Sequence, residues 1–193
     1  KGWRKRSYTC ETKIRKKGKF RKMTEATKQE KTLFMTRLMT PDMSNFSGKV
    51  HGGTILKLLD EAAFTCASRY CKTYVVTKSL DQVVFKNPIE VGDLVTFKCN
   101  VNYVGKTSME IGVRVEGERI KEKFEYHAIS SYFTMVSVDE DGKPMEVPRI
   151  EFASDVEEKL FEAGKMRCAM RKEIQERNNK LHVRLDNWIK LWE

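Results

Sequence analysis

A glycine-bearing turn and a carboxylate seven residues further on are the parts of this chain best suited to chemistry. Residues 45–60 read NFSGKVHGGTILKLLD, and a loop is predicted to end at Gly52 and Gly53, where an apolar helix begins. Glycine has no Cβ, so another molecule can approach the backbone closely there. The first N–H groups of a helix lack intrahelical partners and lie at the positive end of its dipole. They can therefore bind an anion, or an oxygen that gains negative charge during a reaction.

Asp60 is the carboxylate, and it lies in the middle of the predicted apolar helix. At about 100° per residue it falls on nearly the same face as Gly53, roughly 10 Å away. A carboxylate is rarely buried without a partner. Asp60 is therefore either part of a structural ion pair or cap, or a catalytic base that holds water near the helix start, and the pattern leaves both open. Glu61 points about 100° away and is expected to face solvent or a salt bridge.

Hydrophobic periodicity predicts the elements that must position these groups. A helix that is apolar nearly all round is predicted over 52–70, and such a helix belongs inside a protein. Alternating or β-rich segments predict strands at 31–40, 74–85, 95–103, 109–115 and 126–138. The fold class is therefore α+β, with a mostly antiparallel sheet wrapped around one long buried helix.

A second helix is predicted after the capping box Ser154-x-x-Glu157. It carries one apolar stripe, which we expect to pack on the domain or on a partner subunit. The stripe consists of Val156, Leu160, Ala163, Met166, Met170 and Ile174, and it continues at helical spacing with Leu181, Leu185, Trp188 and Trp192. A role in packing is favoured over one in membrane binding.

Composition limits the remaining possibilities. The 193 residues are 40% hydrophobic, which suits one domain at 31–150, a basic N-terminal arm at 1–30 and a C-terminal helical extension at 151–193. The net charge of +10 favours an anionic partner such as nucleic acid, a membrane surface or a phosphate-rich small molecule. There is no apolar run of about 18 residues, so no membrane span is predicted.

The five cysteines include no C-x-x-C pair, so no metal site is expected, and buried thiols indicate a reducing compartment. We expect a cytoplasmic protein, although the basic start leaves a mitochondrial or other organelle location open.

Together these segments resemble the hotdog fold, in the acyl-CoA thioesterase branch that includes cytosolic acyl-CoA hydrolase and the short YciA-type bacterial enzymes. The match covers most of residues 33–148, in order and with the right spacing. The matching segments are Pro41-Asp42; Asn45, Gly48 and His51-Gly52-Gly53-Thr54-Ile55-Leu56; Asp60 and Ala62; Val75-Val76-Thr77; Phe85, Pro88-Ile89 and Val91-Gly92-Asp93; Val104-Gly105-Lys106-Thr107-Ser108; and Val136, Val138-Asp139 and Gly142-Lys143-Pro144.

The resemblance implies hydrolysis of acyl-CoA thioesters to free acid and CoA, with CoA as substrate and product and with no cofactor. It also implies a homodimer of hotdog units that share two sites, and assembly of three dimers into a hexamer. Asp60 would be the catalytic carboxylate of one subunit. Asn45 would be its polar partner, and the His51-Gly52-Gly53 turn the oxyanion donor, both from the other subunit. We expect the backbone of His51 to matter more than its ring.

The phosphates of CoA suggest further contacts. Lys106 in the Gly105–Ser108 turn is predicted as a point charge for them, with Thr107 and Ser108 as hydrogen-bond donors. Lys86 and Thr77 are further candidates for substrate binding. An ordinary hairpin turn with a solvated lysine remains the alternative at Lys106.

Three other functions remain open at this stage. A hotdog dehydratase or isomerase would act on enoyl-CoA, and a sensor would bind acyl-CoA without turnover. A nucleic-acid-binding or ribosome-associated module would use the basic arm 1–30. For a thioesterase we expect no nucleic-acid partner. No Ser-His-Asp order is evident, so serine esterase activity is not expected.

Overall fold

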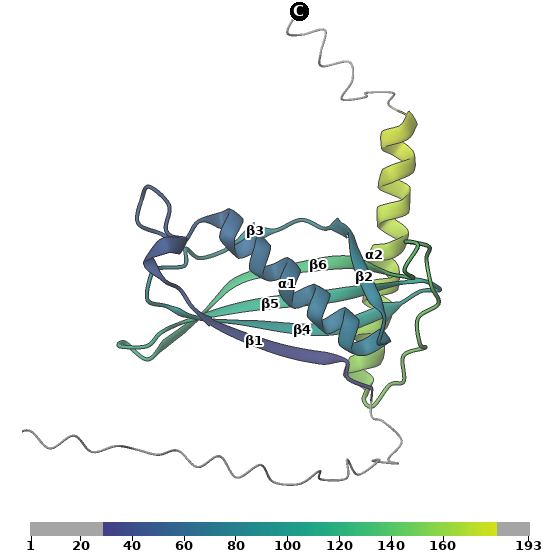
Figure 1. The fold of residues 1–193 in the computed structure, drawn as a ribbon, viewed down its shortest axis with the longest axis horizontal. Coiled ribbons are helices and arrows are strands. Elements are labelled where there is room, and N and C mark those ends of the chain that lie inside the picture. Colours follow the sequence, from purple (N-terminus) through teal and green to yellow (C-terminus); the bar gives the residue numbers. More distant parts are fainter. Residues whose placement is uncertain (1–28, 181–193) are drawn as a thin grey trace, which may run out of the picture.

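The computed structural model describes residues 29–180, in which a curved antiparallel sheet of six strands surrounds one helix (Figure 1). The predicted basic arm and the apolar positions after Lys180 lie outside the described residues. The elements in chain order are β1 (Thr32–Leu38), a 3-10 turn η1 (Pro41–Met43), α1 (Gly52–Cys71), β2 (Tyr74–Leu80), β3 (Val84–Phe85), β4 (Leu94–Val104), β5 (Ser108–Arg119), β6 (Phe124–Val138) and α2 (Asp155–Lys180).

The strand order is β1-β4-β5-β6-β2, and β3 pairs with β6 beyond the end of β2. All of these pairings are antiparallel. The three long strands β4, β5 and β6 form the centre, whereas β1 and β2 are edge strands with one side unpaired within residues 29–180. The predicted fold class, an antiparallel sheet wrapped around one long helix, is confirmed.

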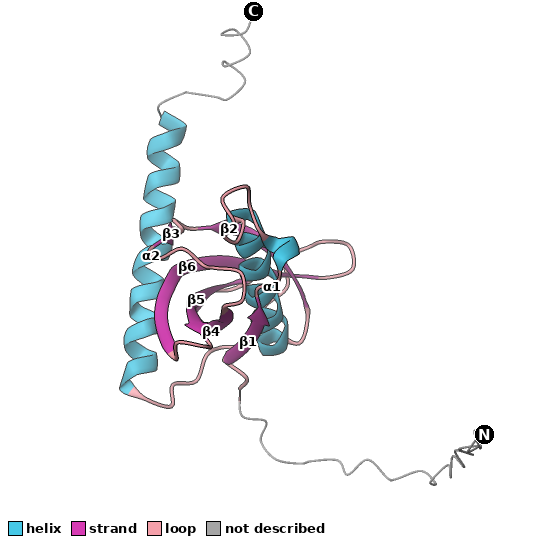
Figure 2. Ribbon diagram, turned by 90° about the vertical axis from the view of Figure 1, so that its left-hand side faces the viewer, coloured by secondary structure: helices cyan, strands magenta, loops and turns pink. Residues whose placement is uncertain are grey.

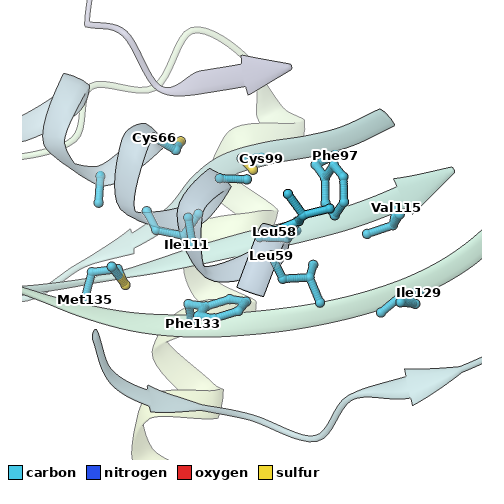
Figure 3. Packing of buried hydrophobic residues seen from close by; sticks show 14 of the residues in the cluster. Leu58, Leu59, Cys66, Phe97, Cys99, Ile111, Val115, Ile129, Phe133 and Met135 are labelled. Carbon is cyan, nitrogen blue, oxygen red and sulfur yellow. The ribbon is translucent and has the colours of Figure 1, made fainter. Parts of the chain in front are cut away.

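The core lies between α1 and the concave face of the sheet (Figures 1 and 3). On β4 the residues Val95, Phe97, Cys99 and Val101 are buried and alternate with more exposed neighbours, because successive side chains of a strand point to opposite faces. Each large apolar side chain buried in this way stabilises the fold by about 1.5–3 kcal/mol. This packing fixes the position of α1, whose start and middle carry the candidate site.

Two core thiols, Cys66 of α1 and Cys99 of β4, are buried in this interior (Figure 3). Desolvation by burial raises the pKa of both thiols from the ordinary value of 9.0 to about 12. Between pH 9 and pH 12 these thiols stay neutral in the folded protein, whereas they ionise in the unfolded chain. Their contribution to the free energy of unfolding is therefore complete below pH 9 and is lost as the pH rises toward 12.

We expect a thiol reagent at pH 8 to label Cys66 and Cys99 on unfolding in urea and not before. Cys168, which is half-buried on α2, serves as the internal control. Mass spectrometry of the labelled peptides checks this. Equal labelling rates for Cys66 and Cys168 in the native protein would contradict the prediction.

Helix α2 lies on the outer, convex face of the sheet (Figure 2). Its predicted cap is present, since the N–H of Glu157 donates to Oγ of Ser154 (3.4 Å). The Glu157 carboxylate accepts from the N–H of Ala153 (2.7 Å) and also binds the ammonium group of Lys31, which directly precedes β1. The cap therefore ties the start of α2 to the beginning of β1.

A buried charge cluster holds the middle of α2 on the sheet. Glu110 of β5 is only 1% exposed, and Arg167 of α2 donates to both of its carboxylate oxygens (2.6 and 3.2 Å). Arg171 donates to Glu110 (3.0 Å) and to Asp81 (2.6 Å). Gly164 allows the close approach, because a Cβ there would lie 2.6 Å from the Cβ of Tyr103.

The predicted packing of the apolar stripe over 156–174 on its own domain is therefore wrong. The contacts of α2 with the sheet come from Gly164, Arg167, Arg171 and Phe161. Apart from the half-buried Ala163, the side chains of the stripe up to Ile174 are exposed. The alternative, packing on a partner subunit, stays a prediction.

In residues 29–180, neither helix combines the length and the apolar character needed to span a bilayer.

Candidate active site

The start of α1 is capped by the side chain of the residue before it. The N–H of Gly53 donates to Nδ1 of His51 (2.9 Å), and the His51 carbonyl accepts from the N–H groups of Thr54 (3.0 Å) and Ile55 (3.2 Å). The N–H of Gly52 has no acceptor among residues 29–180. Of the His51-Gly52-Gly53 turn predicted as the oxyanion donor, the amide of Gly53 is thus engaged within the turn itself, and the free amide is that of Gly52.

Asn45 organises the loop that leads into this helix. Its Oδ1 accepts from the N–H of Ser47 (2.9 Å), the hydroxyl of Ser47 (2.7 Å) and the N–H of Lys49 (3.1 Å). Gly48 turns the chain with φ of +77°, a conformation that favours glycine. Because the amide oxygen faces these donors, Nδ2 of Asn45 is left to donate, and it has no acceptor in the described part of the chain.

A cavity of about 450 Å³ opens beside the free amide. It brings together three of the predicted site residues, Asn45, Gly52 and Lys86. Its other lining residues are Ser47, Lys49, Val50, Ile55, Phe85, Asn87, Pro88 and Ile89. The cavity is therefore lined by apolar side chains and a few polar groups, as is usual for small-molecule sites.

Asp60 lies in a second group of predicted site residues, at the place where α1 packs against β2. The hydroxyl of Thr77 donates to Oδ1 of Asp60 (2.6 Å), and no described residue donates to Oδ2. Thr77 was predicted to bind substrate, and its bond to Asp60 was not foreseen. Glu61 points elsewhere and pairs with Lys57 (3.7 Å), as expected. Within one subunit Asp60 does not line the cavity that contains Asn45 and Gly52.

The turn predicted to bind phosphates lies at the far end of the sheet. Leu38 pairs with Leu94 at the start of β4, near the loop that enters α1, whereas Gly105 and Lys106 follow the other end of β4. Lys106 is exposed, and its Nζ lies 3.6 Å from a Glu146 carboxylate oxygen. A separate cavity of about 620 Å³ adjoins it, whose lining residues include Gly105, Lys106, Arg149, Phe152 and Phe161. One subunit thus does not bring Lys106, Thr107 and Ser108 together with Asn45.

An antiparallel sheet wrapped around one long helix is the architecture of the hotdog fold. The family model for the thioesterase superfamily matches residues 47–123. Protein VdlD of Helicobacter pylori is 46% identical over 139 residues, which are 72% of this chain and 79% of the relative. The chain belongs to the thioesterase superfamily, and the resemblance to the acyl-CoA thioesterase branch is confirmed.

Two solved structures extend the comparison. The acyl-CoA hydrolase of Staphylococcus aureus, in complex with butyryl-CoA, CoA and CoA disulfide, is 30% identical with a TM-score of 0.72, covering 79% of this chain and 93% of its own. A hexameric acyl-CoA thioesterase without ligand is 35% identical with a TM-score of 0.70, covering 80% of this chain and 96% of its own.

The Staphylococcus aureus hydrolase was also solved as three alanine variants. They replace an asparagine, an aspartate that follows it by 15 positions, and a threonine that follows the aspartate by 17. In the present chain Asn45, Asp60 and Thr77 are separated by the same 15 and 17 positions.

Proposed function

We propose that the chain hydrolyses acyl-CoA thioesters to free carboxylic acid and CoA, with Asp60 as the base that activates water. The observation that carries this proposal is the bond from the Thr77 hydroxyl to Asp60, which leaves the second carboxylate oxygen free for a water molecule. The shared spacing of Asn45, Asp60 and Thr77 with the three residues replaced in the Staphylococcus aureus hydrolase supports the assignment.

The complete site is proposed to form between two copies. β2 is an edge strand, so one side of its backbone is free to pair with another strand. Apolar side chains that are 36–63% exposed surround it and would be buried by a second copy. They are Leu56, Tyr74, Val76, Leu80, Val84 and Phe85. Phe85 also lines the cavity at the start of α1, so a copy seated on this edge would reach the cavity.

In the proposed reaction the acyl carbonyl binds with its oxygen toward the N–H of Gly52 from one subunit. Asp60 of the other subunit takes a proton from water as the water oxygen attacks the carbonyl carbon. The C–S bond then breaks, and the proton passes from Asp60 to the departing thiolate of CoA. One backbone donor to the developing oxyanion is worth about 2.7–4 kcal/mol of barrier. Asn45 Nδ2 is a second donor for the water or the carbonyl.

The contacts to the nucleotide end of CoA are a further part of the proposal. Lys106 would bind a phosphate, with Thr107 and Ser108 as hydrogen-bond donors, and Lys86 would bind near the acyl cavity. Because Lys106 lies at the opposite end of β4 from Asn45, its contact would come from a neighbouring subunit. The hexameric relative supports such an assembly, and we propose three dimers in the present protein also.

Mixing two inactive variants tests the shared site. In a mixed dimer of Asn45→Ala and Asp60→Asn subunits, one site carries both changes and the other is intact. Random 1:1 reassembly is therefore expected to restore about one quarter of the wild-type activity, from two variants that are each nearly inactive alone. Release of CoA thiol from a panel of acyl-CoAs measures it. If each site lay within one subunit, the activity of the mixture would equal the average of the activities of the two variants measured alone.

A further inference from the structure

The exposed apolar stripe of α2 has no role in the proposed hydrolysis. It consists of five side chains that are 36–66% exposed, on a helix whose last turns extend beyond the sheet (Figures 1 and 2). These residues, called the α2 stripe from here on, are Val156, Leu160, Met166, Met170 and Ile174. Contiguous apolar surface of this kind marks an interaction site more often than chance exposure.

The domain cannot cover the α2 stripe by turning the helix. Arg167 and Arg171 are bonded to Glu110, which is buried in the sheet. Gly164 packs so closely on Tyr103 that no side chain would fit between them. Rotation of α2 would leave the Glu110 carboxylate buried and unpaired, which is strongly unfavourable. The stripe is therefore held to one side of the sheet-facing surface, and what covers it must come from elsewhere.

We propose that a second copy of this chain covers it, through antiparallel pairing of the two α2 helices about a two-fold axis near Lys165. The stripe is self-complementary in that arrangement. Val156 and Ile174 lie equally far from residue 165, and so do Leu160 and Met170, while Met166 is next to it. In a two-fold interface residue i of one copy meets residue j of the other and j meets i. Each outer residue of the stripe thus meets an apolar residue.

Charge supports the same orientation. Around the helix, Lys159 lies about 60° from the line through Val156 and Ile174, and Glu173 lies about 100° from that line on the same side. Among the residues that the structure describes, Lys159 has no carboxylate partner. Antiparallel pairing about residue 165 places Lys159 of each copy within about 3 Å, along the helix axis, of Glu173 of the other, twice by symmetry. Lys159 would there share a carboxylate that Arg177 of the same helix already binds (2.6 Å).

The contact is long enough to matter. From Val156 to Ile174 the helix is about 27 Å long. Its two-fold axis differs from the one proposed through β2. Two different two-fold axes generate a closed assembly of four copies where they meet at 90°, and of six copies where they meet at 60°. The expected copy number rests on the dimer proposed above, whereas the pairing of α2 itself does not.

Replacing Met170 by lysine tests the proposal, because it sets a charge against Leu160 of the second copy. Light scattering on the full chain is expected to show that the variant has at most half as many copies per particle as the wild type. The matched control is Ile120→Lys, which alters a residue of similar exposure (49%) at the end of β5 and should leave the mass unchanged. An unchanged mass for Met170→Lys would overturn the proposal. Mass is read without turnover, so this result is independent of whether acyl-CoA is hydrolysed.

Cross-linking tests the orientation and the occupant. The double variant Val156→Cys/Ile174→Cys is expected to form disulfide-linked dimers on mild oxidation. Val156→Cys alone is expected to form no more linked dimer than the wild-type protein, which has its own cysteines. Linkage of Val156→Cys alone would indicate parallel helices and overturn the arrangement. A chain that ends at Lys180 is expected to keep the wild-type copy number. Loss of copies in that chain would assign the interface to residues 181–193 instead.

Discussion

Replacing Asp60 by asparagine is expected to lower kcat for acyl-CoA hydrolysis by about 10²–10⁴-fold, the usual worth of a positioned general base. Asparagine has nearly the same shape and can still accept the hydroxyl bond from Thr77, so the fold should be preserved. What it loses is the capacity to take a proton from water. Steady-state thiol release over a range of acyl-CoA concentrations gives kcat and KM, and thermal unfolding of the same samples checks the fold.

The neighbouring carboxylate provides the control. Glu61→Gln removes a charge one residue along the same helix, but Glu61 faces away from Thr77 and pairs with Lys57. It should leave kcat within about two-fold of wild type, since a surface pair of this kind is worth little. Equal kcat for Asp60→Asn and wild type would refute the assignment of the base. Thr77→Val should cause a smaller loss in kcat than Asp60→Asn, because Thr77 acts by positioning Asp60.

Replacing Glu110 by alanine is expected to destabilise the protein by about 3 kcal/mol, near the lower end of what breaking a buried ion pair costs. Glu110 is nearly inaccessible and accepts from both Arg167 and Arg171. Without it Arg167 has no carboxylate partner in the described residues, and Arg171 retains Asp81. Both guanidinium groups are partly solvated, which is why the lower figure is expected. Urea unfolding at fixed protein concentration measures the free energy of unfolding.

Glu125→Ala is the matched control, because Glu125 is also a strand glutamate but is exposed on β6. Its effect should lie within about 0.5 kcal/mol of zero, as for most surface substitutions. Limited proteolysis adds a local readout, since α2 should become susceptible in Glu110→Ala before the sheet does. If the two alanine variants unfold at the same urea concentration, Glu110 does not hold α2 in place.

Sequence patterns predicted the strands and α1 because those signals are local. Strict alternation along β4 and β5 depends on which face of a strand meets the core, and an all-round apolar helix can lie only inside. The same alternation is uninformative at Glu110. Glu110 alternates with apolar residues on β5, a pattern typical of a solvent-facing position, but α2 covers that face. Coverage by a distant element is not encoded in the strand. The signal that was available is the pair Arg167 and Arg171, four residues apart on one helix face.

Within the site, residue identity was easier to predict than bonding. Asn45, Asp60 and the glycine turn stand out by type and spacing, and the structure describes all of them. Which amide at the helix start remains free depends on the rotamer of His51, which sequence does not specify. Within one subunit the residues lie in two groups. In the dimer that we propose, contacts between copies complete the site, and the pattern of a single chain does not reveal such contacts.

The bond from Gly53 to Nδ1 of His51 sets how many donors the start of α1 can offer. Since that nitrogen accepts, the ring hydrogen lies on Nε2. A rotation of the ring that breaks this bond would set the second amide free beside the first. The turn would then present two N–H groups to an incoming oxygen instead of one.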